Sequence, residues 1–234
     1  RASHKQKYSL VDHKRLFDKE TIFKTKLISY HLSFPVKEKQ KAGKFKKESS
    51  LTFKGNMIKK VVNRKGTQVL VFFDEVDFVR CELWNLNEQK MISNTTFKRW
   101  PAYADFSNTD KVVCIQFDSP KLYLFETGDF TALDSVDGTF PICFSENNKC
   151  LVYTDNNKQL FMYDLVNKKY KHVIQTNHQT VLSDIKFNHA HGYLATAGYD
   201  GMIKFWDIET GEFLLSLAVF GKHDFIYVSP DNYY

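Results

Sequence analysis

The chain has 234 residues, enough for one large β domain or two small domains. Its 43% hydrophobic and 26% charged residues are close to the averages of globular proteins and exclude a wholly disordered or fibrous chain. The 21 Phe and 12 Tyr outnumber the 10 Gly and 5 Pro, which favours strands over helices. No window reaches the roughly 20 apolar residues of a membrane-spanning helix. The chain starts at Arg1, which leaves its compartment open, with the cytoplasm slightly favoured over export.

The N-terminal region, positions 1–65, is strongly basic. Its lysines and arginines outnumber its acidic side chains and give a net charge of +14, whereas the remainder of the chain carries −8. The run from Pro35 to Ser50 has few apolar residues and six lysines, a composition typical of a solvated loop: Lys37, Lys39, Lys41, Lys44, Lys46 and Lys47. These lysines are candidate docking residues for an acidic protein or for the phosphates of nucleic acid or lipid. A purely solvated loop is the favoured interpretation.

Pairs of an aromatic and a polar residue recur along the chain at nearly even intervals. They are Trp84-Asn85, Phe125-Glu126, Tyr163-Asp164 and Trp206-Asp207. A phenylalanine precedes each of the last three at one constant distance (Phe106, Phe144 and Phe187), and Val62 precedes the first at a slightly longer distance. Tyr30-His31 is a weaker fifth pair, for which the lysine-rich run would be an insertion between two blades. A repeat of about 40–45 residues with strand alternation predicts the blades of a propeller.

The stretch from His178 to Leu217 shows the repeat most clearly. Four alternating apolar runs, at 184–187, 193–197, 202–208 and 213–217, are separated by His-Gly, Asp-Gly and Thr-Gly turn signals. Runs of period two between such turns predict four short antiparallel strands.

This stretch resembles a WD repeat, the blade unit of a β-propeller family. The resemblance rests on His178, Thr196, Asp200 and the pair Trp206-Asp207. It implies a structural network in which the His, hydroxyl, Asp and Trp side chains are hydrogen-bonded inside the blade. Asn177 replaces the family's Gly and also tolerates a left-handed backbone. One repeat earlier, Tyr153 and Asn157 replace the hydroxyl and Asp, so we expect packing to hold that blade without a buried hydrogen-bond chain.

The resemblance implies an all-β WD-repeat-like propeller over residues 1–234, with four-stranded antiparallel blades. We expect about five blades, fewer than such propellers usually have, so the propeller would be incomplete in this chain. Residues 215–234 would start a further blade or lead to another domain. The last dozen residues weakly resemble the junction in bacterial proteins where WD repeats precede a caspase-like peptidase domain.

Standard catalytic signatures are missing from the sequence, and we expect neither enzyme activity nor a cofactor. His178, His189 and His191 could bind a metal, but a blade interior and a tight turn account for them. Cys143 could pair with His178 as a nucleophile, but its place on an inner strand favours packing. The four cysteines are interpreted as free thiols, with a Cys143–Cys150 bridge as the less favoured alternative.

Three functions fit these patterns. The first is a non-enzymatic scaffold that binds protein partners in a larger assembly through its loop faces. The second is the sensor portion of a larger caspase-like peptidase. The third, which is less favoured, is nucleic-acid binding through the basic N-terminal region.

Overall fold

The computed structural model describes residues 29–35, 48–220 and 224–230, and strands dominate them. The described residues contain no α-helix, and their single helical turn is a 3-10 turn at His189–His191. No helix among them is long and apolar enough to cross a membrane. The expected all-β fold is confirmed.

Every pair of neighbouring strands is antiparallel. A two-stranded sheet holds β1 (Ser29–Pro35) and β2 (Glu48–Lys54). Sheet I holds β3 (Asn56–Val62), β4 (Gln68–Asp74), β5 (Val79–Asn85) and β6 (Lys90–Phe97). Sheet II holds β7 (Tyr103–Phe106), β8 (Val112–Gln116), β9 (Lys121–Glu126) and β10 (Ala132–Asp137). Sheet III holds β11 (Thr139–Phe144), β12 (Cys150–Thr154), β13 (Gln159–Asp164) and β14 (Lys169–Gln175). Sheet IV holds β15 (Leu182–Asn188), β16 (Tyr193–Gly198), β17 (Met202–Asp207), β18 (Phe213–Phe220) and β19 (Asp224–Val228).

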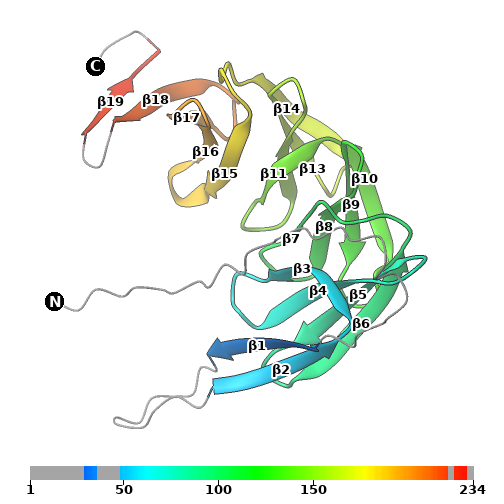
Figure 1. Cartoon of the computed structure of the whole chain (residues 1–234). Helices are drawn as coiled ribbons and strands as arrows, with labels where there is room; N and C mark the ends of the chain where they lie inside the picture. The colour runs from blue at the N-terminus through cyan, green and yellow to red at the C-terminus, as the bar shows by residue number, and fades with distance from the viewer. Residues whose placement is uncertain (1–28, 36–47, 221–223, 231–234) are drawn as a thin grey trace, which may run out of the picture.

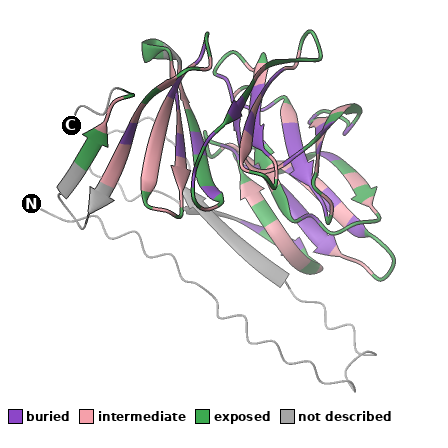
Figure 2. Cartoon of the chain, turned by 90° about the horizontal axis from the view of Figure 1, so that it is seen from above, coloured by how far each residue is buried: buried purple, intermediate pink, exposed green. Residues whose placement is uncertain are grey.

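The sheets follow one another around an arc, and the first strand of each large sheet faces its inside (Figure 1). Apolar cores fill the space between neighbouring sheets. Sheets I and II share one core, sheets II and III a second, and sheets III and IV a third. The second strands are apolar on both faces, as in β4, where Leu70 to Phe73 are fully buried. Figure 2 shows buried residues within the strands and exposed residues on most of the loops that connect them.

The aromatic–polar pairs occupy one equivalent place in all four large sheets. Each pair forms the last two residues of the third strand, in β5, β9, β13 and β17. In three of the sheets the polar residue also closes the following turn: Asp207 Oδ1, for example, accepts the backbone N–H groups of Glu209 and Thr210. Asp164 and Asn85 do the same in their sheets. A short side-chain oxygen that caps its own turn explains this residue type at the position.

Two segments lie elsewhere than we expected. The lysine-rich run does not separate two blades: it connects β1 to β2, and Pro35 pairs with Glu48 at their shared end. Its six candidate docking lysines, at positions 37–47, lie outside the described residues. Residues 215–228 do not begin a new sheet, because β19 pairs with β18 and widens sheet IV to five strands.

Candidate functional site

The structure brings the four network residues of sheet IV together. His178 lies in the connection before β15, Thr196 on β16, Asp200 in the turn after β16 and Trp206 on β17. The indole N–H of Trp206 donates to the Thr196 hydroxyl at 3.0 Å, and that hydroxyl lies 3.0 Å from Nε2 of His178. Nδ1 of His178 lies 3.0 Å from the Asp200 carboxylate. These hydrogen bonds link the connection before β15 to strand β16, to the turn after β16 and to strand β17.

When His178 is neutral, every hydrogen-bonding side chain of this network has a matching donor or acceptor. The Nδ1–H of His178 donates to Asp200, and its Nε2 accepts the Thr196 hydroxyl proton, which leaves the hydroxyl oxygen to accept from Trp206. Burial lowers the pKa of His178, although Asp200 acts in the opposite direction. Burial opposes the charge on Asp200 too, but hydrogen bonds from the backbone N–H groups of Met202 and Gln179 and from His178 outweigh it and lower the pKa of Asp200. The network is therefore built around a neutral imidazole and a carboxylate.

Three neighbouring residues make room for the network and hold it in place. A Cβ on Gly198 would come within 2.5 Å of Asp200 and 2.7 Å of His178, so only glycine fits there. Asn177 adopts φ of 50°, the left-handed conformation expected of it. Lys204 donates to the carbonyls of Thr176 and Asn177 and fastens the connection to β17.

In sheets I and III, the aromatic residue at the position of Trp206 makes a hydrogen bond to a different partner. In sheet I, the indole N–H of Trp84 donates to Glu82 at 2.9 Å. In sheet III, the Tyr163 hydroxyl donates to Asp134 at 3.1 Å, and the fully buried Tyr153 reaches the Tyr170 hydroxyl at 3.3 Å. These tyrosine hydroxyls add single, partly buried hydrogen bonds to the packing of sheet III, one of them to Asp134 on β10 of sheet II. The expectation that this blade is held without a buried hydrogen-bond chain stays a prediction.

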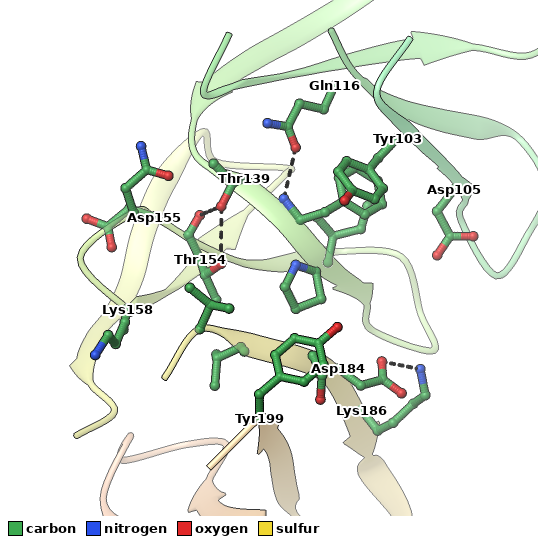
Figure 3. Close-up of a pocket in the computed structure, with 17 residues that line it drawn as sticks. Tyr103, Asp105, Gln116, Thr139, Thr154, Asp155, Lys158, Asp184, Lys186 and Tyr199 are labelled. Atoms are coloured by element: carbon green, nitrogen blue, oxygen red, sulfur yellow. Dashed lines mark hydrogen bonds and ion pairs between the residues drawn. The ribbon is translucent and has the colours of Figure 1, made fainter. Parts of the chain in front are cut away.

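A cavity of about 610 Å³ opens on the inner side of the arc, between sheets II, III and IV (Figure 3). Its walls are formed by the first strands of these sheets, the ends of β8 and β12, and the loops that follow β12 and β16. Tyr103 stacks on Phe140 with ring centroids 5.2 Å apart, and Tyr199 lies on the opposite wall. Tyr103 is 53% exposed and Tyr199 75% exposed. Two aromatic rings therefore present large apolar surfaces to solvent at one concave site.

Charged side chains of both signs line the same cavity. Lys186 pairs with Asp184 at 2.7 Å, and Lys158 donates to the carbonyls of His178 and Gln179. Asp105 accepts the N–H of Phe106, and desolvation by the surrounding walls raises the pKa of Asp105. The cavity thus combines aromatic surface with hydrogen-bonding groups held in fixed positions.

No motif or spacing in the sequence pointed to this cavity. Its residues come from three sheets and from positions as distant in the chain as Tyr103 and Tyr199. The one available signal was Tyr199 in the turn before Asp200-Gly201, where a large aromatic residue has no evident packing role.

The cysteine and histidine candidates from the sequence occupy packing or hydrogen-bonding positions in the structure. All four cysteines are free, so Cys143 and Cys150 are not bridged. Burial raises the pKa of the Cys143 thiol, and both ring nitrogens of His178 are occupied by Asp200 and Thr196. The described part of the chain holds no group of three His, Cys, Asp or Glu side chains arranged to bind a metal.

Comparisons with known proteins agree with the geometry of sheets III and IV. Residues 169–207 match the family model described as WD domain, G-beta repeat. A 92-residue stretch is 34% identical to the peroxisomal targeting signal 2 receptor of Schizosaccharomyces pombe, and it covers 38% of this chain. The match spans 30% of the length of that receptor.

Proposed function

We propose that this chain, which carries a WD repeat within a propeller-like series of sheets, is a non-enzymatic scaffold that binds protein partners. The cavity between sheets II, III and IV is its proposed contact site. One observation carries the proposal: two solvent-exposed tyrosine rings, Tyr103 and Tyr199, face a single concave site.

Exposed aromatic side chains in a cavity suit protein recognition. Tyrosine is enriched among the residues that contribute most to binding, because it offers a large rigid surface and a polar tip. The ring of Tyr103 is already held by its stack on Phe140, so binding would cost little side-chain entropy there. The fixed carbonyl, carboxylate and ammonium groups around the rings would select the orientation of the partner.

The test uses a partner recovered with the chain and then purified. We expect Tyr199→Ala to weaken its binding at least tenfold, because truncating an exposed aromatic anchor removes buried apolar area from the complex without disturbing the fold. Tyr227→Ala is the matched control, since Tyr227 is 55% exposed on β19, outside the cavity. Equal affinities of the wild type and Tyr199→Ala would place the contact site elsewhere.

Recognition of a targeting signal is a second candidate function. It is favoured by the 34% identity over 92 residues to a protein named as a receptor for peroxisomal targeting signal 2. A peptide that carries this signal, added to the purified chain, should bind with micromolar or better affinity and compete with a partner at the cavity. Absence of binding at millimolar peptide would discard this candidate and leave the scaffold proposal standing.

A further inference from the structure

Sheet II carries a different set of residues at the positions of the sheet IV network. The two sheets can be superposed strand by strand, because their second and third strands pair in the same register: Val113 faces Phe125 as Leu194 faces Trp206. With these pairs aligned, His178, Thr196, Asp200 and Trp206 correspond to Phe97, Ile115, Ser119 and Phe125. Three of the four positions have lost their polar hydrogen-bonding groups, and the fourth, the buried Ser119 hydroxyl, has no hydrogen-bond partner among the described residues.

The surrounding positions have changed together with the network. Phe117 stands where sheet IV has Gly198, and Tyr123 where it has Lys204. In sheet IV the glycine makes room for His178 and Asp200, whereas in sheet II the Phe117 ring packs against Phe97 and Tyr123. At the positions where sheet IV has a hydrogen-bonded polar network, sheet II therefore has a cluster of aromatic rings.

Four rings surround an apolar hollow of about 290 Å³ where sheets I and II meet: Phe97 ends β6 of sheet I, Phe117 follows β8, and Tyr123 and Phe125 lie on β9. Phe97 lies 5.0 Å from Phe117 and 5.4 Å from Phe125 between ring centroids, and Tyr123 lies 5.5 Å from Phe117. Phe117 is buried and the other three rings are partly buried, so each of the three keeps some surface exposed to solvent at the hollow. This volume suits one anchoring side chain, being near the lower end of the range for small-molecule sites.

The rim of the hollow is cationic. Lys98 and Arg99 follow Phe97 in the chain and are both exposed. Arg99 lies 3.7 Å from Asp118, but both side chains are more than half exposed, so this ion pair contributes little and leaves the guanidinium available. Trp100, 56% exposed, extends the apolar surface next to these cations.

We propose that this hollow, formed by Phe97, Phe117, Tyr123 and Phe125 with Lys98 and Arg99 at its rim, binds an acidic peptide segment that inserts one apolar side chain. Burial of the anchor among the rings supplies affinity that is nearly independent of salt. Aspartate or glutamate next to the anchor pairs with the rim cations and speeds association at low salt. The site is distinct from the proposed cavity, because none of the hollow's residues lines that cavity.

The experiment is a selection from a displayed library of random dodecapeptides on the purified chain. Peptides retained by the wild type are counter-selected on Lys98→Glu/Arg99→Glu, and the affinities of the recovered peptides are measured by fluorescence anisotropy. We expect recovered sequences with an aromatic or branched apolar residue beside Asp or Glu. Their binding should weaken at least tenfold in the charge-reversed variant and at least fivefold in Tyr123→Ser, which removes one wall of the hollow.

Lys90→Glu/Lys169→Glu is the matched control, because it reverses two exposed lysines away from the hollow. It should bind as the wild type does, and circular dichroism should show every variant folded.

Recovered peptides that are basic, that lack an apolar anchor or that bind equally well to the charge-reversed variant would overturn the proposal, as would an empty selection. Preferential binding of a single-stranded oligonucleotide at this rim would also overturn it. Tyr199→Ala should leave peptide binding here unchanged, so a failure at this site is separable from a failure at the cavity.

Discussion

The Thr196 hydroxyl oxygen accepts the indole N–H of Trp206 at 3.0 Å, between the neighbouring strands β16 and β17. Trp206 is 4% exposed and belongs to the core shared by sheets III and IV. Trp206 thus belongs both to the polar network of sheet IV and to the apolar core between sheets III and IV.

Replacing Trp206 by Ala should lower the free energy of unfolding by about 3–5 kcal/mol, the range for truncating a large core aromatic. Trp206→Phe keeps most of the ring and loses one hydrogen bond, so it should cost less, about 1–2 kcal/mol. Denaturant unfolding of both variants provides the measurement. A loss below about 1 kcal/mol for Trp206→Ala would contradict the assigned position, given the usual range for such truncations.

Gly198→Ala should destabilise the chain by about 1–3 kcal/mol, because the new methyl group would press on His178 and Asp200, both fixed by hydrogen bonds. Gly128→Ala is the control, since a Cβ there meets nothing within 4 Å. The midpoint of unfolding should be clearly lower for Gly198→Ala than for Gly128→Ala. Equal midpoints would show that His178 and Asp200 can shift to admit the methyl group at little cost.

Acid should weaken the fold through His178. Because burial lowers its folded pKa below the ordinary value of 6.5, the unfolded chain binds more protons as the pH falls. The stabilisation by the neutral ring is fully present above about pH 6.5 and is lost as the pH falls through the folded pKa. Unfolding free energies measured from about pH 8 to 5 should fall less steeply in His178→Gln than in the wild type or the exposed-site control His191→Gln. Parallel pH profiles would contradict a neutral, buried His178.

The four thiols should react slowly with a disulfide reagent at about pH 8 while the chain is folded. Burial raises the pKa of Cys81, Cys114 and Cys143, and it raises that of Cys150 to about 12, so little reactive thiolate is present. All four should react promptly in denaturant. Rapid labelling of one thiol in the folded chain would identify an exposed cysteine that the structure does not contain.

The lysine-rich run between β1 and β2 remains a candidate docking element. Changing Lys41, Lys44, Lys46 and Lys47 to Glu should weaken binding to an acidic partner or to nucleic acid and flatten its salt dependence, because fewer counterions are released. Stability should change by less than about 0.5 kcal/mol. Binding assays at two salt concentrations provide the measurement, and unchanged binding would leave the run as a solvated connection.

The sequence by itself predicted much of the blade pattern. Alternating runs predicted strands, and the aromatic–polar pairs predicted where the third strands end, because side chains alternate between the two faces of a strand and Asp or Asn caps its own turn. His178, Thr196, Asp200 and Trp206 could be grouped in advance only through their resemblance to a known repeat.

Tertiary structure alone decided the sites proposed for binding. Tyr103 and Tyr199 face one cavity because three sheets pack side by side. The hollow among Phe97, Phe117 and Phe125 exists because the end of β6 in sheet I packs against residues of sheet II. The Tyr163–Asp134 hydrogen bond between sheets III and II likewise joins residues that are distant in the chain. Local sequence sets strand and turn preferences, but contacts between distant segments depend on how side chains of different sizes fill the space between sheets.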